Sequence, residues 1–329
     1  MLDWLNEFAR HTKTDWLHQI ALDNPDFDSQ KQKHKVRENF EGLSFATFED
    51  LPNDPTSLTD ARHPLLWKAG SIFDSRDRKE CHRRILLALS NGADKISLSS
   101  DWLVNQEDIN TLLDGVHTNM IELMFEWHGQ SNQSLFKVKN NIPEHCFLGL
   151  IANDLDAHEN DIEWLNQHNV KVMINLPLFD LIAVKNILKQ VVANFDDTKI
   201  PLRFIFNFDH KMLINIAAYR AIVKFLQTKS ELFETEIRIA PQVISRIPEE
   251  NLISFSAIAL AAGICRPDLI TLPAYDHLDE QNKDSWVINS VHLQHILRQE
   301  AQLRLVNDPV AGSYYIENLT HQFFTFLQV

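Results

Sequence analysis

The sequence predicts an α/β protein whose strands close into a (β/α)8 barrel, preceded by an N-terminal helical arm. Three observations support this fold class. Short β-branched or aromatic runs alternate with segments of helical periodicity, eight such units follow one another, and no glycine-rich turn follows the first strand. Such alternation implies parallel strands joined by right-handed crossovers, and eight units suit a barrel. A doubly wound open sheet is the alternative, which the missing glycine-rich turn disfavours.

The predicted strands are short, apolar and separated by turn-forming or polar residues. In order they cover 68–73, 95–99, 120–127, 146–152, 171–176, 202–208, 236–243 and 269–274. Helices are predicted between them, where apolar residues recur every three to four positions. These helices cover 78–91, 106–116, 161–168, 180–194, 211–227 and 249–262.

Two flanking segments complete the predicted organisation. Residues 1–66 contain helical patterns at 4–8 and 15–22 and then a loop rich in Asp, Pro and Thr. They hold too few apolar residues for a core of their own, so we interpret them as an arm. Residues 67–329 are predicted to form the barrel, which ends with a long amphipathic helix over 287–305 and a further segment after it.

Composition and charge exclude several classes of function. The 329 residues include 45 acidic and 31 basic ones, a formal net charge of −14 that disfavours a nucleic-acid partner. The 8 glycines form neither a GxGxxG nor a GxxxxGK[ST] loop. The three cysteines form no CxxC pair, which excludes a thiolate zinc site and fits a reducing compartment. Without a signal-peptide pattern or a long apolar run, we expect a cytoplasmic protein with no membrane partner.

Strand alternation places a set of polar side chains inside the predicted barrel. One interpretation is a polar catalytic cavity with paired carboxylates. The other is a lumen filled by salt bridges, such as those of Glu122 and Glu126 with Arg203 and Arg238. Buried charges are costly unless paired, so equal numbers of both signs favour the filled lumen. The other side chains predicted to point inward are Ser97, Ser99, Met124, Met173, Asn175, Ile205, Asn207, Ala240 and Gln242.

Two small constellations have both a chemical and a structural interpretation. Asp209 and His210 follow the sixth strand, at the barrel face where enzymes keep their chemistry, and could form an acid–base pair. Asp209 could equally cap the next helix, which is the interpretation we favour. His292 and His295 have a spacing that could hold a metal, but no HExxH pattern or third ligand accompanies them, so we interpret them as surface histidines.

The most specific motif lies near the C-terminal end. The segment NDPVAGSYYIENLT (307–320) resembles the DP-GGSYY-E-LT motif of methylmalonyl-CoA mutases. Weaker similarities to the same family occur in family order along nearly the whole chain. They are TKTDWLHQIALDN (12–24), EGLSFATFED (41–50), AAYRA (217–221), RIAPQVISR (238–246) and VINSVHLQHILRQE (287–300).

The resemblance implies a (β/α)8 TIM barrel of the type that rearranges methylmalonyl-CoA and succinyl-CoA with adenosylcobalamin. The chain departs from the active members of that family. Its first tyrosine is Tyr219, so the family's first-strand tyrosine has no counterpart, and 175–185 lacks the family's substrate-contacting histidine. Asp156 and His158 have the opening of a DxHxxG cobalamin loop, but Asp161 stands at the glycine position, and we interpret the match as chance. The C-terminal cobalamin-binding domain is expected to be absent.

These departures imply the non-catalytic small (beta) subunit of a heterodimeric mutase. The expected partner is the catalytic large subunit, which would carry adenosylcobalamin, while this chain would hold no cofactor, metal or catalytic residue. The arm would wrap that partner through Trp4, Phe8 and Trp16, unless these residues pack on their own barrel. The alternative hypothesis is a stand-alone barrel that binds or acts on an acyl-CoA, with Asp209, His210, Arg238 and Gln242 as candidate residues. A chaperone-like binding role is a weaker third possibility.

Overall fold

A computed structural model of the chain describes most of the barrel and parts of both flanks. The described residues are 11–28, 33–37, 40–52, 67–73, 77–99, 106–127, 142–143, 146–151, 170–195, 202–230, 233–278 and 283–328.

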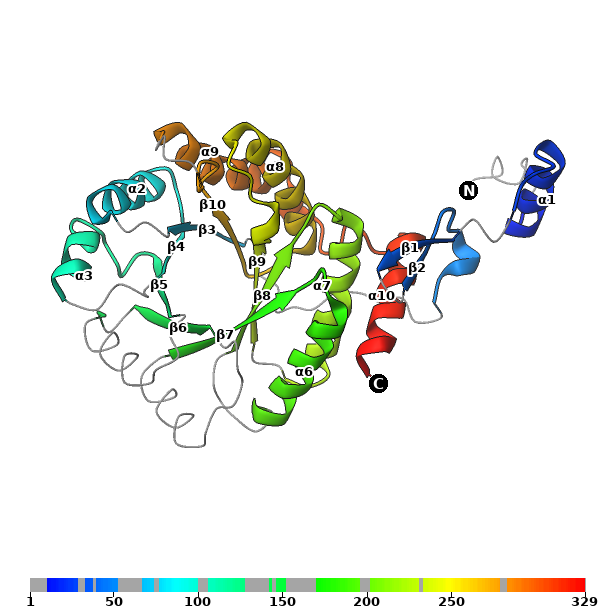
Figure 1. The fold of residues 1–329 in the computed structure, drawn as a ribbon, viewed down its shortest axis with the longest axis horizontal. Coiled ribbons are helices and arrows are strands. Elements are labelled where there is room, and N and C mark those ends of the chain that lie inside the picture. The colour runs from blue at the N-terminus through cyan, green and yellow to red at the C-terminus, as the bar shows by residue number, and fades with distance from the viewer. Residues whose placement is uncertain are drawn as a thin grey trace, which may run out of the picture.

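Eight parallel strands close into a barrel, which confirms the predicted α/β TIM-barrel fold (Figure 1). The ring closes because the last strand pairs with the first, with Leu269 opposite Lys68. Neighbouring strands in sequence are neighbours in space all around the ring. The strands are β3 (Lys68–Phe73), β4 (Lys95–Ser99), β5 (Glu122–Trp127), β6 (Phe147–Ile151), β7 (Val170–Pro177), β8 (Leu202–Phe208), β9 (Phe233–Ile239) and β10 (Leu269–Pro273).

Helices cover the outside of the barrel (Figure 1). The core lies between them and the strands, where outward-facing aromatic residues of β8 pack on helix α7, with the rings of Phe206 and Tyr219 4.7 Å apart. The predicted helix over 161–168 lies outside the described residues. The barrel helices are α2 (Arg78–Ser90), α3 (Gln106–Leu113), α6 (Leu181–Phe195), α7 (Met212–Gln227), α8 (Pro248–Cys265) and α9 (Asp284–His295).

Two predicted elements differ from the structure by more than three residues at one end. Strand β9 runs over 233–239 rather than 236–243, because Pro241 begins a 3-10 turn, η4 (Pro241–Val243), and a proline has no N–H for the strand ladder. Gln242 therefore lies exposed on this turn and does not point into the barrel. The helix predicted over 287–305 ends sooner: α9 continues as a π-helical turn, η5 (Ile296–Glu300), and Gln302 then adopts a positive φ of 53°.

The N-terminal flank forms a helix and a hairpin. Helix α1 (Lys13–Asp23) begins at a capping box in which Thr12 and Asp15 bond each other's backbone N–H groups, and none of its side chains is buried. The hairpin pairs β1 (Lys33–Arg37) with β2 (Phe40–Leu43) and is followed by the 3-10 turn η3 (Phe48–Asp50). The sequence analysis predicted the helix but not the hairpin.

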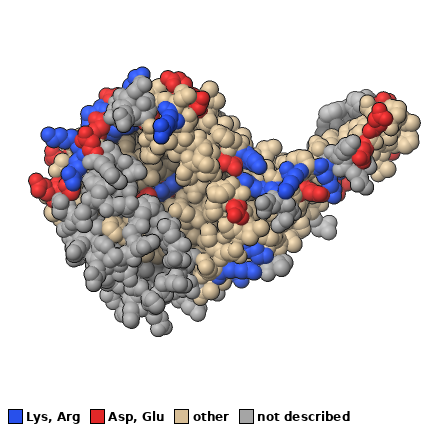
Figure 2. Space-filling view, viewed as in Figure 1, with Lys and Arg blue, Asp and Glu red and all other residues tan. Residues whose placement is uncertain are grey.

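Helix α10 (Tyr314–Gln328) joins this flank to the barrel. It packs on α7 along one side and on the hairpin along the other (Figure 1). The ring of Phe40 lies edge-on to Phe323 and Phe326, with centroids 4.8 and 5.3 Å away. Helix α1 lies beyond the hairpin, at the far end from the barrel. The exposed residues of β1 are basic, and Figure 2 shows blue side chains gathered in this connecting region.

Candidate functional site

The centre of the barrel holds a network of ion pairs. Arg203 on β8 is fully buried, and its guanidinium donates to Glu122 at 2.6 Å, to Glu234 at 2.5 Å and to Glu236 at 3.4 Å. Lys68 lies 2.8 Å from Glu122. Thus one arginine joins carboxylates from β5 and from two positions of β9. The predicted salt bridge of Glu122 with Arg203 is confirmed.

A second part of the network lies deeper in the lumen. Lys95 on β4 donates to Glu236 at 2.7 Å and to the Thr271 hydroxyl at 3.4 Å, and both charged side chains are fully buried. Arg238 donates to the other oxygen of Glu236 at 2.6 Å. Glu236 is therefore shared by three cations, of which Arg203 is the third.

The network ends near the carboxyl ends of the strands. Arg238 reaches across the barrel to Glu126 and donates to both carboxylate oxygens, at 2.8 and 2.6 Å. Such bidentate pairing is the strongest arrangement for these two groups. The Arg238 side chain remains 11% exposed. This confirms the predicted pairing of Glu126 with Arg238.

Burial and neighbouring charges together lower the pKa values of the glutamates and of Lys95 in the lumen. Burial would raise the pKa of Glu122, but the nearby charges of Arg203, Lys95 and Lys171 outweigh it and lower the pKa to about 2. The same balance holds the pKa of Glu236 well below its usual range. Burial lowers the pKa of Lys95 to about 8 despite the carboxylate of Glu236. The glutamates are thus ionised near neutral pH and have no proton to donate as general acids.

An apolar layer fills the space beside the charges. Met124, Met173 and Ile205 form a buried cluster inside the barrel, with Phe147 packed against it. Strand β6 contributes Gly149 at this level, where an added Cβ would collide with the sulfur atoms of both methionines. The two methionine side chains therefore occupy the space that a larger side chain at position 149 would need. Ion pairs and this layer together fill the described lumen.

In the described part of the barrel mouth, two of the inward-facing side chains are amides. Asn175 and Asn207 end the inward-facing rows of β7 and β8 and are partly exposed, and Asn207 lies opposite Arg238 in the strand register. The carboxyl ends of barrel strands are where enzymes of this fold place their reacting groups. Near this end, the described inward-facing rows thus contain two amides and an arginine that is already paired with Glu126, while Asp209 and His210 follow the end of β8.

The alternative candidate residues do not form one cluster. Asp209 accepts hydrogen bonds from the Lys211 N–H at 2.8 Å and the Asn215 amide at 3.0 Å, and Arg37 of the hairpin lies 3.5 Å away. The predicted capping role is wrong, because α7 begins at Met212 after Lys211, and Asp209 instead bonds the turn before the helix and the Asn215 side chain of its first turn. His210 is exposed beside it. Among the described contacts, no hydrogen bond or ion pair joins any two of Asp209, His210, Arg238 and Gln242.

The two histidines that were expected at the surface differ, because His292 is exposed and His295 is half-buried. His295 contacts the Gly92 carbonyl through Nε2 at 3.0 Å and Arg298 through Nδ1 at 2.9 Å. Within the part of the chain that the structure describes, no group of three or more His, Cys, Asp or Glu side chains could hold a metal ion. Asp156, His158 and Asp161 lie outside the described residues, as do Ser99's side chain, Trp4 and Phe8.

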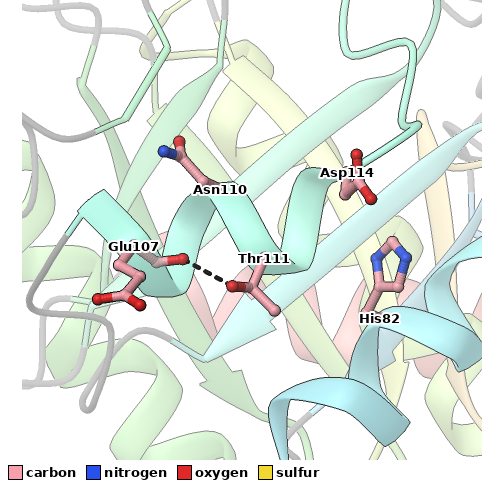
Figure 3. A pocket seen from close by; sticks show the side chains of 5 residues that line it. All are labelled: His82, Glu107, Asn110, Thr111 and Asp114. Atoms are coloured by element: carbon pink, nitrogen blue, oxygen red, sulfur yellow. Dashed lines mark hydrogen bonds between the residues drawn. The ribbon is translucent and has the colours of Figure 1, made fainter.

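One surface pocket lies on the outer wall between α2 and α3. Four of its residues follow helical spacing along α3 and the turn after it, and His82 faces them from α2 (Figure 3). The Thr111 hydroxyl donates to the Glu107 carbonyl at 2.8 Å, and His82 Nδ1 lies 3.0 Å from the Leu112 carbonyl. This pocket is separate from the barrel mouth. Its lining residues are His82, Glu107, Asn110, Thr111 and Asp114.

Part of the ion network does not appear among the residues predicted to point inward. Lys95, Lys171, Glu234 and Glu236 belong to it, although none was named as pointing inward. The signal was available for three of them, because each lies two residues before an inward position already assigned on the same strand. Glu234 was missed because it precedes the predicted start of its strand.

Comparisons with known proteins found a family model that matches part of the chain and solved structures with a similar fold. Residues 183–326, less than half of the chain, match the family model for methylmalonyl-CoA mutase. The dihydropteroate synthase of Yersinia pestis is 12% identical with a TM-score of 0.50, covering 72% of this chain and 93% of that one. That of Thermus thermophilus is 14% identical with a TM-score of 0.49, covering 71% and 95%. At 12% identity, the likeness to the Yersinia pestis structure shows the fold alone.

A search of curated proteins found no match to the chain. No helix among the described residues is both long and apolar enough to cross a membrane. The matched segment begins in α6, ends in α10, and contains both the AAYRA stretch and the NDPVAGSYYIENLT motif. The segment that is similar to the methylmalonyl-CoA mutase family model therefore covers the last part of the TIM barrel and most of α10.

Proposed function

We propose that this chain is a non-catalytic partner of an adenosylcobalamin-dependent methylmalonyl-CoA mutase, similar to the small subunit of a heterodimer. The large subunit would carry out the isomerisation of methylmalonyl-CoA and succinyl-CoA. The observation that carries this proposal is the filled lumen. Arg203 and Lys95 are fully buried among carboxylates, and methionines fill the level beside them. An acyl thioester would have to displace these paired charges to reach the barrel axis, at a high cost.

The residues present do not fit a cobalamin site. The DxHxxG pattern requires glycine where this sequence has Asp161, and β3 reads KAGSIF, without a tyrosine. The described lumen offers ionised glutamates held by cations rather than groups free to move a proton. In this proposal, adenosylcobalamin therefore binds to the partner and not to this chain.

The N-terminal flank is the proposed contact with that partner. Helix α1 buries none of its side chains, and an isolated helix of its 11 residues is marginal in water. Leu22 on α1 and Phe48 on η3 are each 63% exposed. Trp16 stacks on Phe45, with centroids 4.2 Å apart, so it packs within the flank rather than on the barrel. Two exposed apolar residues on a flank whose first helix buries none of its side chains favour a further contact there.

The test is copurification of the tagged full chain from its host. The proposal predicts a large mutase subunit in equal amount, with Leu22→Asp and Phe48→Asp reducing its recovery at least tenfold. Met120→Asp is the matched control, because Met120 is 78% exposed on the barrel, outside the flank. A chain that elutes alone, or equal loss with the control, would contradict the proposal.

A second candidate function has one observation in its favour. Arg238 is partly exposed at the barrel mouth, where Asn175 and Asn207 have accessible amides. These groups could bind the carbonyl and amide groups of an acyl-CoA. Calorimetric titration of the isolated chain with acyl-CoA esters tests this, using Asn207→Ala because it leaves the ion pairs intact. Micromolar binding that this variant abolishes would support the alternative, and absence of binding at millimolar ester would exclude it.

A further inference from the structure

The family-like motif at 307–320 is held by two arginines of the barrel helices. Arg220 of α7 is fully buried and donates to Asp308 and, at 2.7 Å, to Glu317. Arg266, at the end of α8, donates to the side chain of Asn307 at 2.8 Å. Three polar residues of the motif are thus bonded to the barrel's outer helices, and none of these bonds involves the ion pairs of the lumen.

The local geometry of the motif depends on these bonds. Gly312 has a φ of 79°, a conformation that glycine adopts readily, and its N–H donates to Glu317 at 3.2 Å. Arg266 itself has a φ of 52°, which is unusual for a residue with a Cβ. Glu317 lies in the first turn of α10, where a negative charge is favourable. The motif therefore fixes the start of α10 against α7.

Helix α10, whose start the motif fixes, is the surface on which the N-terminal flank packs. Besides the packing of Phe40, Gln322 donates to the Glu41 carbonyl at 3.1 Å, and Asn318 donates to the Asp50 carbonyl at 3.3 Å. His34 contacts the Tyr315 hydroxyl at 3.2 Å. Contacts to α10 thus come from β1, β2 and η3.

We infer that Arg220, Asp308 and Glu317 form a latch that positions α10 as the docking seat for residues 33–50. In this assignment, the motif behind the family resemblance holds two parts of the molecule together rather than touching a substrate. Releasing the latch should free α10 and the hairpin as one unit and leave the barrel strands closed. The inference concerns the isolated chain and does not depend on the proposed mutase partner.

Hydrogen exchange of the purified full chain, resolved by peptide, tests the latch. Glu317→Gln keeps the size of the side chain but leaves Arg220 with one carboxylate fewer. We expect exchange to rise at least tenfold in peptides 33–43 and 314–328 and to stay unchanged in β4 and β5. The triple variant Arg220→Met, Asp308→Asn, Glu317→Gln removes the buried charges together and should restore most of the protection.

A second variant distinguishes the contacts between α10 and the flank from the ion pairs of Arg220. Asn318→Ala combined with Gln322→Ala removes the two bonds to the flank without touching Arg220. It should raise exchange in 33–43 while 314–328 stays protected. The inference is overturned if Glu317→Gln raises exchange equally in the barrel strands, because Arg220 would then stabilise the barrel itself. It is also overturned if 33–43 keeps its protection after α10 has opened.

Discussion

Two buried arginines stabilise different parts of this molecule. Arg203 and Arg220 are both fully buried and both bind carboxylates from other elements. Arg203 ties together strands of the closed barrel, where every neighbour is itself part of the sheet. Arg220 ties the barrel to a helix outside it, on which a peripheral hairpin rests. The same arginine–carboxylate pairing can thus fill the interior of the barrel or attach a helix to its outside, depending on which elements surround the pair.

The largest expected effect comes from breaking the lumen network. Arg203→Met would leave Glu122, Glu234 and Glu236 with fewer partners in a closed space. We expect it to lower the free energy of unfolding by about 3–5 kcal/mol. Urea unfolding measures this, with Lys68→Met as control, because that lysine is 54% exposed and its pair should contribute under about 1 kcal/mol. A loss below about 1 kcal/mol for Arg203→Met would show that the lumen tolerates uncompensated charge.

A change in the appended region should act locally instead. Phe40 packs between two phenylalanines of α10, so Phe40→Ala should remove about 3 kcal/mol of packing from the hairpin. Because the hairpin lies outside the barrel, the global unfolding midpoint should change little. Limited proteolysis should instead cleave near residues 33–50 much faster than in the unmodified chain. A fall in global stability equal to the local loss would mean that barrel and hairpin unfold as one unit.

The pH dependence of stability distinguishes the lumen lysine from an ordinary one. The pKa of Lys95 is lowered to about 8 in the folded chain, against about 10.4 when unfolded. Between these values the unfolded state binds more protons, so this group makes stability increase as pH rises from 8 to 10. The gain should be about 1–2 kcal/mol relative to Lys95→Met, measured by urea unfolding at both pH values. Parallel pH profiles for the two proteins would contradict the lowered pKa.

The smallest effect is expected at the far end of the flank. Thr12 caps α1, and Thr12→Ala should cost the helix about 1 kcal/mol. Since α1 buries no side chain, this loss should not reach the barrel. Exchange in residues 13–23 should rise while urea unfolding stays the same. A shift of the unfolding midpoint would reveal a coupling between α1 and the barrel that the described contacts do not explain.

Periodicity was enough to predict the barrel, because each strand–helix unit carries its own apolar pattern. The strand alternation also predicted which residues pair in the lumen, including Arg203 with Glu122. Strand alternation did not predict the hairpin, because residues 33–43 are mostly polar and have no clear apolar pattern. The burial of Phe40 depends on Phe323 and Phe326, which are distant in sequence. Strand alternation also failed at β9, where one proline outweighed an apparently continuous strand pattern.

The fold class, the strand order and the resemblance of the NDPVAGSYYIENLT segment to a mutase motif can all be inferred from the sequence, since they depend on local pattern and order along the chain. The contacts of that motif depend on the tertiary structure. Asp308 and Glu317 meet Arg220 across 88 and 97 residues of sequence, and Lys95 meets Glu236 across 141. Such pairings depend on the closure of the barrel and the docking of α10. A buried charge needs an oppositely charged partner, and folding brings that partner from a distant part of the sequence.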